Sequence, residues 1–410
     1  MFKKMKKAFS FVLACFLSIS ATFVTNVFAE FKGQVEIKEP TPLLDENGYL
    51  TQSGYCFSPL YQYDRSKIKT PSWRTKEWDF YQISNDKFMV QVTIADISLG
   101  GAVTVGFQDF TTGKNYSTMD LKFFTGGKYD VGYTDKGLCQ NDMTDHSYSL
   151  KKKNFDFSLD VKDDKRYIKF DGKASGMDFK VDITLDMLSD KETGKTHESH
   201  YIAVPFDTKD GKHFYYNQKT NCMAANGTVT LGENIYEYKG LEDDSFCVLD
   251  WGRGVWPLHE VWWWGNGSTQ LEDGRIFGFE IGWGFGDTTC ASESTLFLDG
   301  KAYKIGYLKL EKQDEIVGSF AHVLFGKWKF KDTDRWVIKC YEDPECTIES
   351  DDWNLTMTPD YDNYTMLRFL VVGNLCHQVF GRWNGTVKIN GETIEINDMY
   401  AFLERSDNIW

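Results

Sequence analysis

The sequence contains little proline, no closely paired cysteine motif and fewer basic than acidic side chains. Of its 410 residues only 8 are proline, and 46 Lys and Arg face 60 Asp and Glu, which gives a net charge of −14. Nucleic acids and anionic lipid surfaces are bound through an excess of Lys and Arg, so this balance argues against both partners. No Cys-x-x-Cys, Walker or Gly-x-Ser-x-Gly motif occurs. A zinc knuckle, a nucleotide site and a serine hydrolase therefore have no support.

Aromatic residues, in contrast, are abundant. They make up 16% of the sequence, with 13 Trp, 21 Tyr and 31 Phe. Disordered chains lack such residues, so we expect a folded chain with a substantial core. The length predicts two or three domains, each large enough to bury apolar side chains.

The N-terminal 29 residues have the features of a secretory signal peptide. Lysines at positions 3, 4, 6 and 7 precede an apolar run over 8–23, and small residues lie before Glu30. An uncleaved membrane anchor is the alternative, but the run is near the short limit for crossing a bilayer. Lipidation at Cys15 is a less favoured alternative to signal-peptide cleavage, because Cys15 lies inside the apolar run. We predict a secreted, periplasmic or cell-envelope protein with no integral membrane segment after signal removal.

Eight cysteines remain after the predicted signal. An oxidising compartment permits disulfides, and Cys340 and Cys346 flank a probable turn at Asp343-Pro344. This pair is therefore the best disulfide candidate. We expect most of the other cysteines to be small buried thiols.

Alternation of apolar and polar residues dominates the mature chain. It runs through 155–161, 167–170 and 177–187, and alternation of this kind predicts strands with one buried face. Asp299-Gly300 and Asn390-Gly391 are typical of two-residue hairpin turns. We therefore predict an all-β protein with two successive antiparallel barrel domains, at residues 30–235 and 236–410, after a signal peptide at 1–29.

The segment 248–265 contains four candidate catalytic residues. Asp250, Arg253, His259 and Glu260 lie among five tryptophans. Burial among rings shifts the pKa of a charged group unless the group is paired, and acid–base catalysts are prepared in this way. The alternative is a structural ion pair between Asp250 and Arg253 beneath the tryptophans.

Several other residues are candidate ligand contacts. Amides surrounded by aromatic residues suit hydrogen bonding to a ligand, although they could equally cap backbone groups. The candidates from segments 214–223, 256–264, 287 and 377 are Tyr216, Asn217, Gln218, Asn221, Trp256, Trp264, Asp287 and His377. His377 lies in an apolar run, where a satisfied core histidine is the commoner outcome.

Two further segments bear on the room for a ligand and on metal binding. The stretch 278–286 alternates glycine with bulky residues, so one strand face is bare, which leaves room for a ligand or permits sharp coiling. His197 and His200 have no evident third metal ligand. We expect neither a metal nor a cofactor.

These motifs resemble a known family, the domain of unknown function 2804. The resemblance is carried by residues 41–48, by Tyr216-Asn217-Gln218, by Asp250-Trp251-Gly252-Arg253-Gly254 and by 377–381, and it extends over nearly the whole mature chain. A more remote similarity is to tandem calycin-like barrel proteins of the carotenoid hydratase, tocopherol cyclase and Diels–Alderase type. That similarity implies two lipocalin- or calycin-like barrels with an apolar ligand held between them.

Three functions are compatible with the sequence. The first is an exported protein that binds a hydrophobic small molecule in a cleft between two barrels, with or without isomerase- or hydratase-type acid–base chemistry. The second is a carbohydrate-binding or carbohydrate-active protein, because rings stack on sugars and carboxylates cleave glycosidic bonds. The third is a non-catalytic envelope protein with an aromatic interaction surface.

Overall fold

A computed structural model describes residues 34–133, 137–187, 197–206, 211–310, 336–343, 348–369 and 372–409. The predicted signal peptide lies outside these residues. So does the predicted Cys340–Cys346 disulfide, because residue 346 and the side chain of Cys340 are not described. Within the described ranges, no helix combines the length and the apolar character needed to cross a membrane.

The first sheet has 13 strands, and its main path runs in the order β7-β6-β5-β4-β15-β13-β11-β10-β9-β8. Three further strands lie off this path. Strands β12 and β14 each pair with β13, and β2 pairs with β12. Its strands are β2 (Gly54–Cys56), β4 (Thr75–Ser84), β5 (Phe88–Asp96), β6 (Gly100–Asp109), β7 (Lys114–Phe123), β8 (His146–Lys152), β9 (Phe155–Lys162), β10 (Lys165–Ala174), β11 (Met177–Asp186), β12 (His200–Pro205), β13 (Phe214–Leu231), β14 (Asn234–Lys239) and β15 (Phe246–Val255).

The second sheet has nine strands in the order β19-β18-β17-β16-β24-β23-β22-β21-β20. They are β16 (His259–Gln270), β17 (Ile276–Trp283), β18 (Thr295–Leu298), β19 (Lys301–Lys304), β20 (Tyr307–Leu310), β21 (Trp336–Asp343), β22 (Ile348–Phe369), β23 (Val372–Ile389) and β24 (Glu392–Ile409). A small parallel pair is formed by β1 (Thr41–Pro42) and β3 (Tyr61–Gln62), and the short 3₁₀ helices are η1 (Arg65–Lys67), η2 (Ser72–Arg74) and η3 (Gly240–Glu242).

Both large sheets are antiparallel, and the hairpins predicted at Asp299-Gly300 and Asn390-Gly391 form where the sequence places them. Asp163 and Asp164 join β9 to β10, Asp299-Gly300 joins β18 to β19, and Asn390-Gly391 joins β23 to β24. Every residue of these three turns has a positive φ, between 46° and 85°. Such turns match the twist of the strands that they connect.

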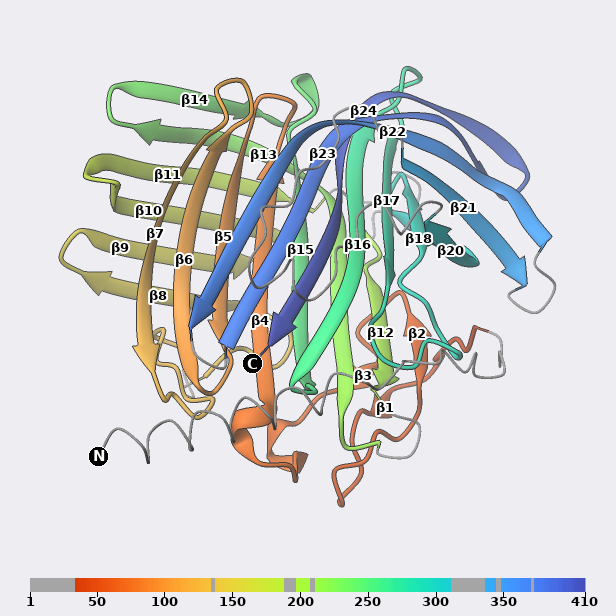
Figure 1. Ribbon diagram of the computed structural model, residues 1–410, viewed down its shortest axis with the longest axis horizontal. Helices are drawn as coiled ribbons and strands as arrows, with labels where there is room; N and C mark the ends of the chain where they lie inside the picture. The colour runs from red at the N-terminus through yellow and green to blue at the C-terminus, as the bar shows by residue number, and fades with distance from the viewer. Residues whose placement is uncertain are drawn as a thin grey trace, which may run out of the picture. The chain divides into compact units, whose positions relative to one another are not determined.

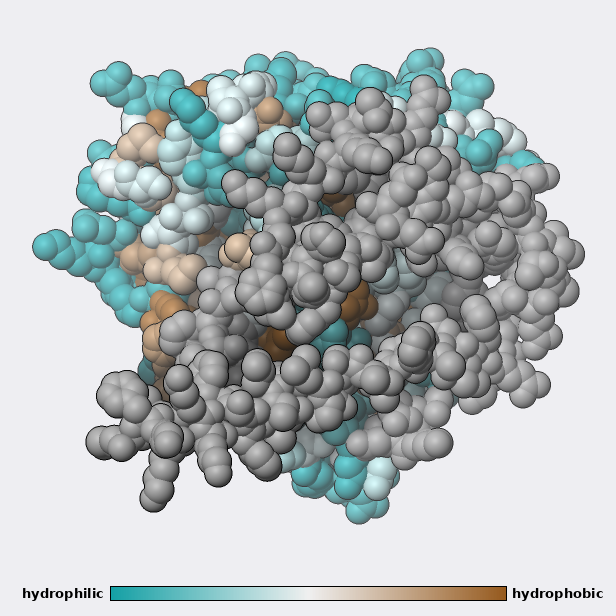
Figure 2. Space-filling view, viewed as in Figure 1, coloured by the Kyte–Doolittle hydropathy of each residue, from teal (hydrophilic) through white to brown (hydrophobic). Residues whose placement is uncertain are grey.

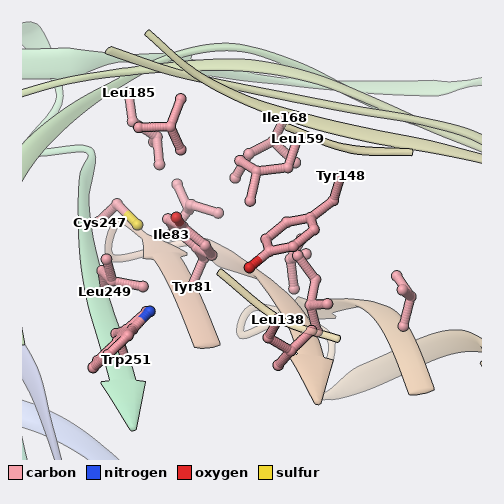
Figure 3. Close-up of a cluster of buried hydrophobic side chains, with 14 of the residues drawn as sticks. Tyr81, Ile83, Leu138, Tyr148, Leu159, Ile168, Leu185, Cys247, Leu249 and Trp251 are labelled. Carbon is pink, nitrogen blue, oxygen red and sulfur yellow. The ribbon is translucent and has the colours of Figure 1, made fainter. Parts of the chain in front are cut away.

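The first sheet curls over its own core. In Figure 1 the strands β4–β7 run vertically in front, and β8–β11 cross behind them. Their facing sides meet in one apolar cluster, part of which Figure 3 shows: Tyr81 and Ile83 of β4 and Leu249 of β15 lie opposite Leu159 and Ile168 of β9 and β10. The predicted all-β class, with curled antiparallel sheets, is confirmed.

The outer face of the first sheet lies against the second sheet. Tyr215 of β13 and Val248 of β15 share an apolar cluster with Trp264 of β16 and Phe402 of β24. The first sheet continues to the end of β15 at Val255, and the second begins with β16. The predicted division into domains at 235/236 stays a prediction.

Candidate active site

A cavity of about 330 Å³ opens between the two sheets. Its apolar lining is aromatic: Trp78, Phe80, Tyr215, Trp256, Trp262, Trp264 and Phe285. On the face shown in Figure 2, the described surface is mostly hydrophilic at the rim, and hydrophobic surface is visible toward the middle. A concave, largely aromatic pocket with a few polar groups is the usual form of a small-molecule site.

An ion pair lies on the first-sheet side of this cavity. The Lys219 ammonium is 2.9 Å from Oδ1 of Asp250 and lies 4.2 Å from the centre of the Trp264 ring. The Asn217 amide donates a hydrogen bond of 2.6 Å to the same Asp250 oxygen. These residues come together because β13 and β15 are neighbours, with Lys219 directly opposite Asp250 in the register.

A second carboxylate, Glu404 of β24, lines the opposite side. It accepts hydrogen bonds from the Trp262 indole at 3.1 Å and from the Gln378 amide at 3.3 Å. Burial raises the pKa of Glu404 to about 7, because the hydrogen bond from Trp262 offsets only part of the cost of a buried charge. At neutral pH this carboxyl can both give up and take up a proton.

Behind the cavity wall lies a buried acidic cluster. The Tyr215 hydroxyl donates to Glu293 at 2.7 Å, the Lys219 ammonium is 4.0 Å from Glu293, and His200 Nδ1 is 3.1 Å from Glu280. Burial and the charge of Glu293 raise the pKa of Glu280 well above its ordinary value. Burial disfavours the charged form of Lys219, but Asp250, Glu293 and Glu280 outweigh this effect and raise its pKa.

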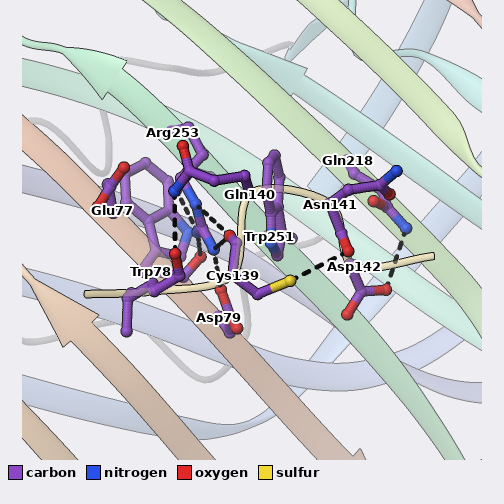
Figure 4. A network of polar contacts seen from close by, with 12 residues as sticks. Glu77, Trp78, Asp79, Cys139, Gln140, Asn141, Asp142, Gln218, Trp251 and Arg253 are labelled. Carbon is purple, nitrogen blue, oxygen red and sulfur yellow. Dashed lines mark hydrogen bonds and ion pairs between the residues drawn. The ribbon is translucent and has the colours of Figure 1, made fainter. Parts of the chain in front are cut away.

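Of the four predicted catalytic residues, only Asp250 is among the described lining residues. Arg253 lies fully buried on the other face of β15 and pairs with Asp79 at 2.8 Å instead of Asp250. Figure 4 shows its guanidinium held by Asp79 and by the backbone carbonyls of Trp78 and Cys139. The proposed Asp250–Arg253 pair is therefore wrong, because residues three apart on a strand face opposite sides.

His259 and Glu260 begin β16 and also face opposite sides. His259 Nε2 lies 2.9 Å from Asp407, on the face away from the cavity. Glu260 is paired across the sheet with Asn408, which lines the cavity, although Glu260 itself is not among the described lining residues. Burial raises the pKa of Glu260 to about 7.

The predicted ligand contacts also include some residues that line the cavity and others that face away from it. Trp256 and Trp264 line the cavity. Asn217 is not among the described lining residues, but its amide donates a hydrogen bond to the lining residue Asp250. Tyr216 packs in the first core, where its ring lies edge-on to Trp251, and Gln218 points to the same side.

Asn221 joins the two sheets. Its amide donates to the Phe279 carbonyl at 2.9 Å, and its side-chain oxygen accepts from Asn266 at 2.8 Å. It follows Thr220 at an irregularity in the β13–β15 register, where Cys222 has a φ of +58°.

The last two predicted contacts, Asp287 and His377, lie elsewhere. Asp287 accepts a hydrogen bond from the backbone of Thr289, and His377 lies 2.7 Å from Asp362 on the face of β23 that is turned away from the cavity. Neither is among the described lining residues.

The bare face of the glycine-rich strand is filled by protein. A Cβ on Gly278 would lie 2.5 Å from the Cys222 sulfur, and a Cβ on Gly282 would lie 2.3 Å from a Glu293 oxygen. The glycines therefore make space for side chains at the contact between the sheets. The sequence left two interpretations of this strand open, room for a ligand or close packing. The structure favours close packing.

Sequence reasoning missed Lys219, Tyr215 and Glu404, which are central to the cavity. A signal was present, because Tyr215, Asn217 and Lys219 alternate with Tyr216 and Gln218. The two sets must face opposite sides of a strand. Which set faces the ligand depends on where the second sheet packs, and the sequence of β13 does not contain that information.

Comparison with known proteins identifies the family. The family model described as "Domain of unknown function (DUF2804)" matches residues 34–410. The chain belongs to the DUF2804 family. No curated protein sequence matches it.

Three solved structures are similar to this DUF2804 chain. Kievitone hydratase from Nectria haematococca has 10% identity and a TM-score of 0.43, covering 91% of this chain and 98% of its own. A putative AttH from Nitrosomonas europaea has 11% identity and a TM-score of 0.44, covering 86% and 98%. CghA has 10% identity and a TM-score of 0.45, covering 92% and 97%. Similarity at this level carries no chemistry over to this chain, so its function is argued below from its own residues.

Proposed function

We propose that this protein is exported, binds a small apolar, ring-containing molecule between its two sheets and transfers a proton to or from it. The observation that carries the proposal is the placement of two carboxylates, Asp250 and Glu404, in one aromatic cavity. Large rings supply most of the binding energy in such a pocket, and the few polar groups orient the ligand.

The two carboxylates differ in their surroundings, as acid–base chemistry requires. Asp250 pairs with the Lys219 ammonium and accepts a hydrogen bond from the Asn217 amide. Glu404, with its pKa near 7, is present in both protonation states at neutral pH. A protonated Glu404 can donate to a double bond or a carbonyl, and Asp250 can accept a proton from water or from the ligand. Isomerisation and hydration both follow from these two transfers.

Binding is tested with N-phenyl-1-naphthylamine, a neutral apolar probe whose fluorescence rises in a dry pocket. The wild-type chain should bind the probe, and Ala95→Trp should weaken binding about ten-fold or more, because Ala95 lines the cavity and is partly exposed to it. Ala102→Trp is the matched control. Ala102 is paired with Ala95 across β5 and β6 but is not among the described lining residues. Equal probe binding by all three proteins would reject the cavity as the binding site.

Proton transfer is tested on whatever small molecule remains bound through purification. Native mass spectrometry identifies that molecule, and incubation in D₂O should place deuterium on its carbon skeleton. Glu404→Gln should abolish the incorporation while the molecule still binds. Unchanged incorporation in this variant would remove Glu404 from the chemistry.

A further inference from the structure

The cavity combines aromatic faces with an excess of carboxylates, which is the chemistry that recognises cations. Its described lining contains two carboxylates, Asp250 and Glu404, and one ammonium, Lys219. The positive charge of Lys219 is further offset by Glu293, 4.0 Å away. The whole chain carries a net charge of −14, so its long-range field also favours a positive ligand.

One part of the site already holds a cation in this way. The Lys219 ammonium lies 4.2 Å from the centre of the Trp264 ring while it pairs with Asp250. A ring face and a carboxylate thus stabilise the same positive charge from two sides. Cation–π attraction strengthens when the charge is shielded from water, as it is for Lys219.

A second carboxylate of the lining, Glu404, also lies beside a tryptophan ring. Trp262 donates to Glu404, and the Trp262 ring lies 5.6 Å from Trp256 at an interplanar angle of 63°. Trp256 lies 5.5 Å from Trp78, also at 63°. Trp262, Trp256 and Trp78 therefore form one run of contacting rings along the cavity lining, which begins at Glu404. A ring face that is open to the cavity can attract a cation.

We propose that the ligand of this cavity carries a positively charged nitrogen, quaternary or protonated, which lies against the tryptophan rings between Asp250 and Glu404. This inference rests on the proposed function and narrows its ligand class: an apolar body with a cationic head.

The test compares two probes of the same shape. Benzyltrimethylammonium is positively charged, and neopentylbenzene is its neutral counterpart with carbon in place of nitrogen. Each is titrated against the full chain carrying N-phenyl-1-naphthylamine, and displacement is read by fluorescence. At pH 8 the cation should bind about ten-fold tighter than the neutral probe, as cation–π attraction and one buried carboxylate together predict.

Two variants locate the preference. Glu404→Gln should reduce the ratio of the two affinities several-fold, because it removes the charge and keeps the size of the side chain. Asp407→Asn is the matched control, since it removes the same charge from β24 on the face turned away from the cavity. Its ratio should equal that of the wild type.

A pH series on the wild-type chain tests the same point without a variant. Glu404 is faced by Trp262 on β16, by Cys376 and Gln378 on β23, and by the Asp250–Lys219 pair of the first sheet. Glu260, which is paired with the lining residue Asn408, also has its pKa raised to about 7 by burial. The preference for the cation should increase between pH 6 and pH 8 as Glu404 loses its proton, and most of this increase should be absent when the series is repeated with Glu404→Gln.

The outcomes separate the two proposals. Equal affinity for both probes at pH 8, or a preference unaffected by Glu404→Gln in a folded variant, would overturn the cation site and leave the apolar-ligand proposal standing. Failure of the chain to bind N-phenyl-1-naphthylamine or either probe would overturn both.

Discussion

Asp250 and Arg253 point to opposite faces of strand β15, although only two residues separate them. Asp250 faces the cavity between the sheets, and Arg253 faces the core of the first sheet, where it pairs with Asp79. Side chains alternate along a strand, so positions three apart can never share a side. The strand therefore divides one conspicuous motif into a site residue and a structural residue.

Arg253→Leu should destabilise the fold strongly. The substitution leaves Asp79 buried without its cation and breaks the hydrogen bonds to the Trp78 and Cys139 carbonyls. Removing one partner of a buried pair costs about 3–5 kcal/mol. Urea denaturation followed by tryptophan fluorescence measures this loss. Asp250→Asn, three residues earlier, should cost clearly less, and equal losses for the two variants would contradict the division of roles.

Lys219 and Asp250 should be energetically coupled. Lys219→Met leaves both Asp250 and Glu293 without their nearest cation, at a cost of about 3 kcal/mol or more. Adding Asp250→Asn removes one of the two stranded charges, so the double variant should be more stable than the sum of the single losses predicts. A double-mutant cycle from urea denaturation measures the coupling. If the two losses of stability are strictly additive, Lys219 and Asp250 do not stabilise each other.

Glu404→Gln should flatten the dependence of stability on pH. The folded pKa of Glu404, about 7, is above the ordinary value of 4.5, so between these values the folded chain keeps a proton that the unfolded chain has released. Stability therefore falls as pH rises through this window, by up to about 1.4 kcal/mol per pH unit for this one group. Gln resembles the protonated form, so the variant should gain stability over the wild type at pH 8 and not at pH 4.

Thermal unfolding at pH 4, 6 and 8 checks this prediction. Glu395→Gln serves as the control because Glu395 is exposed on the same strand. If both variants follow the wild-type curve in parallel, Glu404 does not hold a proton in the folded chain.

Gly282→Ala should cost stability because its Cβ would lie 2.3 Å from Glu293 and 2.8 Å from the Phe285 ring. Overpacking of this kind costs about 1–3 kcal/mol. Gly106→Ala in β6 is the control, since its nearest neighbours are 3.9 Å away. The melting temperature should fall for Gly282→Ala and stay the same or rise slightly for Gly106→Ala.

Local patterns predicted the strands and turns well, since these depend on neighbouring residues. Alternation over 177–187 predicts β11, and the Asp-Gly and Asn-Gly pairs form the hairpins expected of them. For the site, the sequence identified the correct segments but often the wrong neighbour. The sequence indicates Tyr216, but Tyr215 lines the cavity, and it indicates His377, but the neighbours Cys376 and Gln378 line the cavity.

The amino-acid sequence by itself determined the β class, the hairpin turns and the aromatic, acidic character of the chain, because each follows from composition or from interactions between residues close in sequence. Only the tertiary structure decided which face of β13, β15, β23 and β24 meets the cavity. Both faces of these strands are largely buried, one in a core and one between the sheets, so hydrophobic patterning cannot tell them apart. The pairing of Lys219 with Asp250, and the placement of Glu404 in the same cavity, depend on that packing.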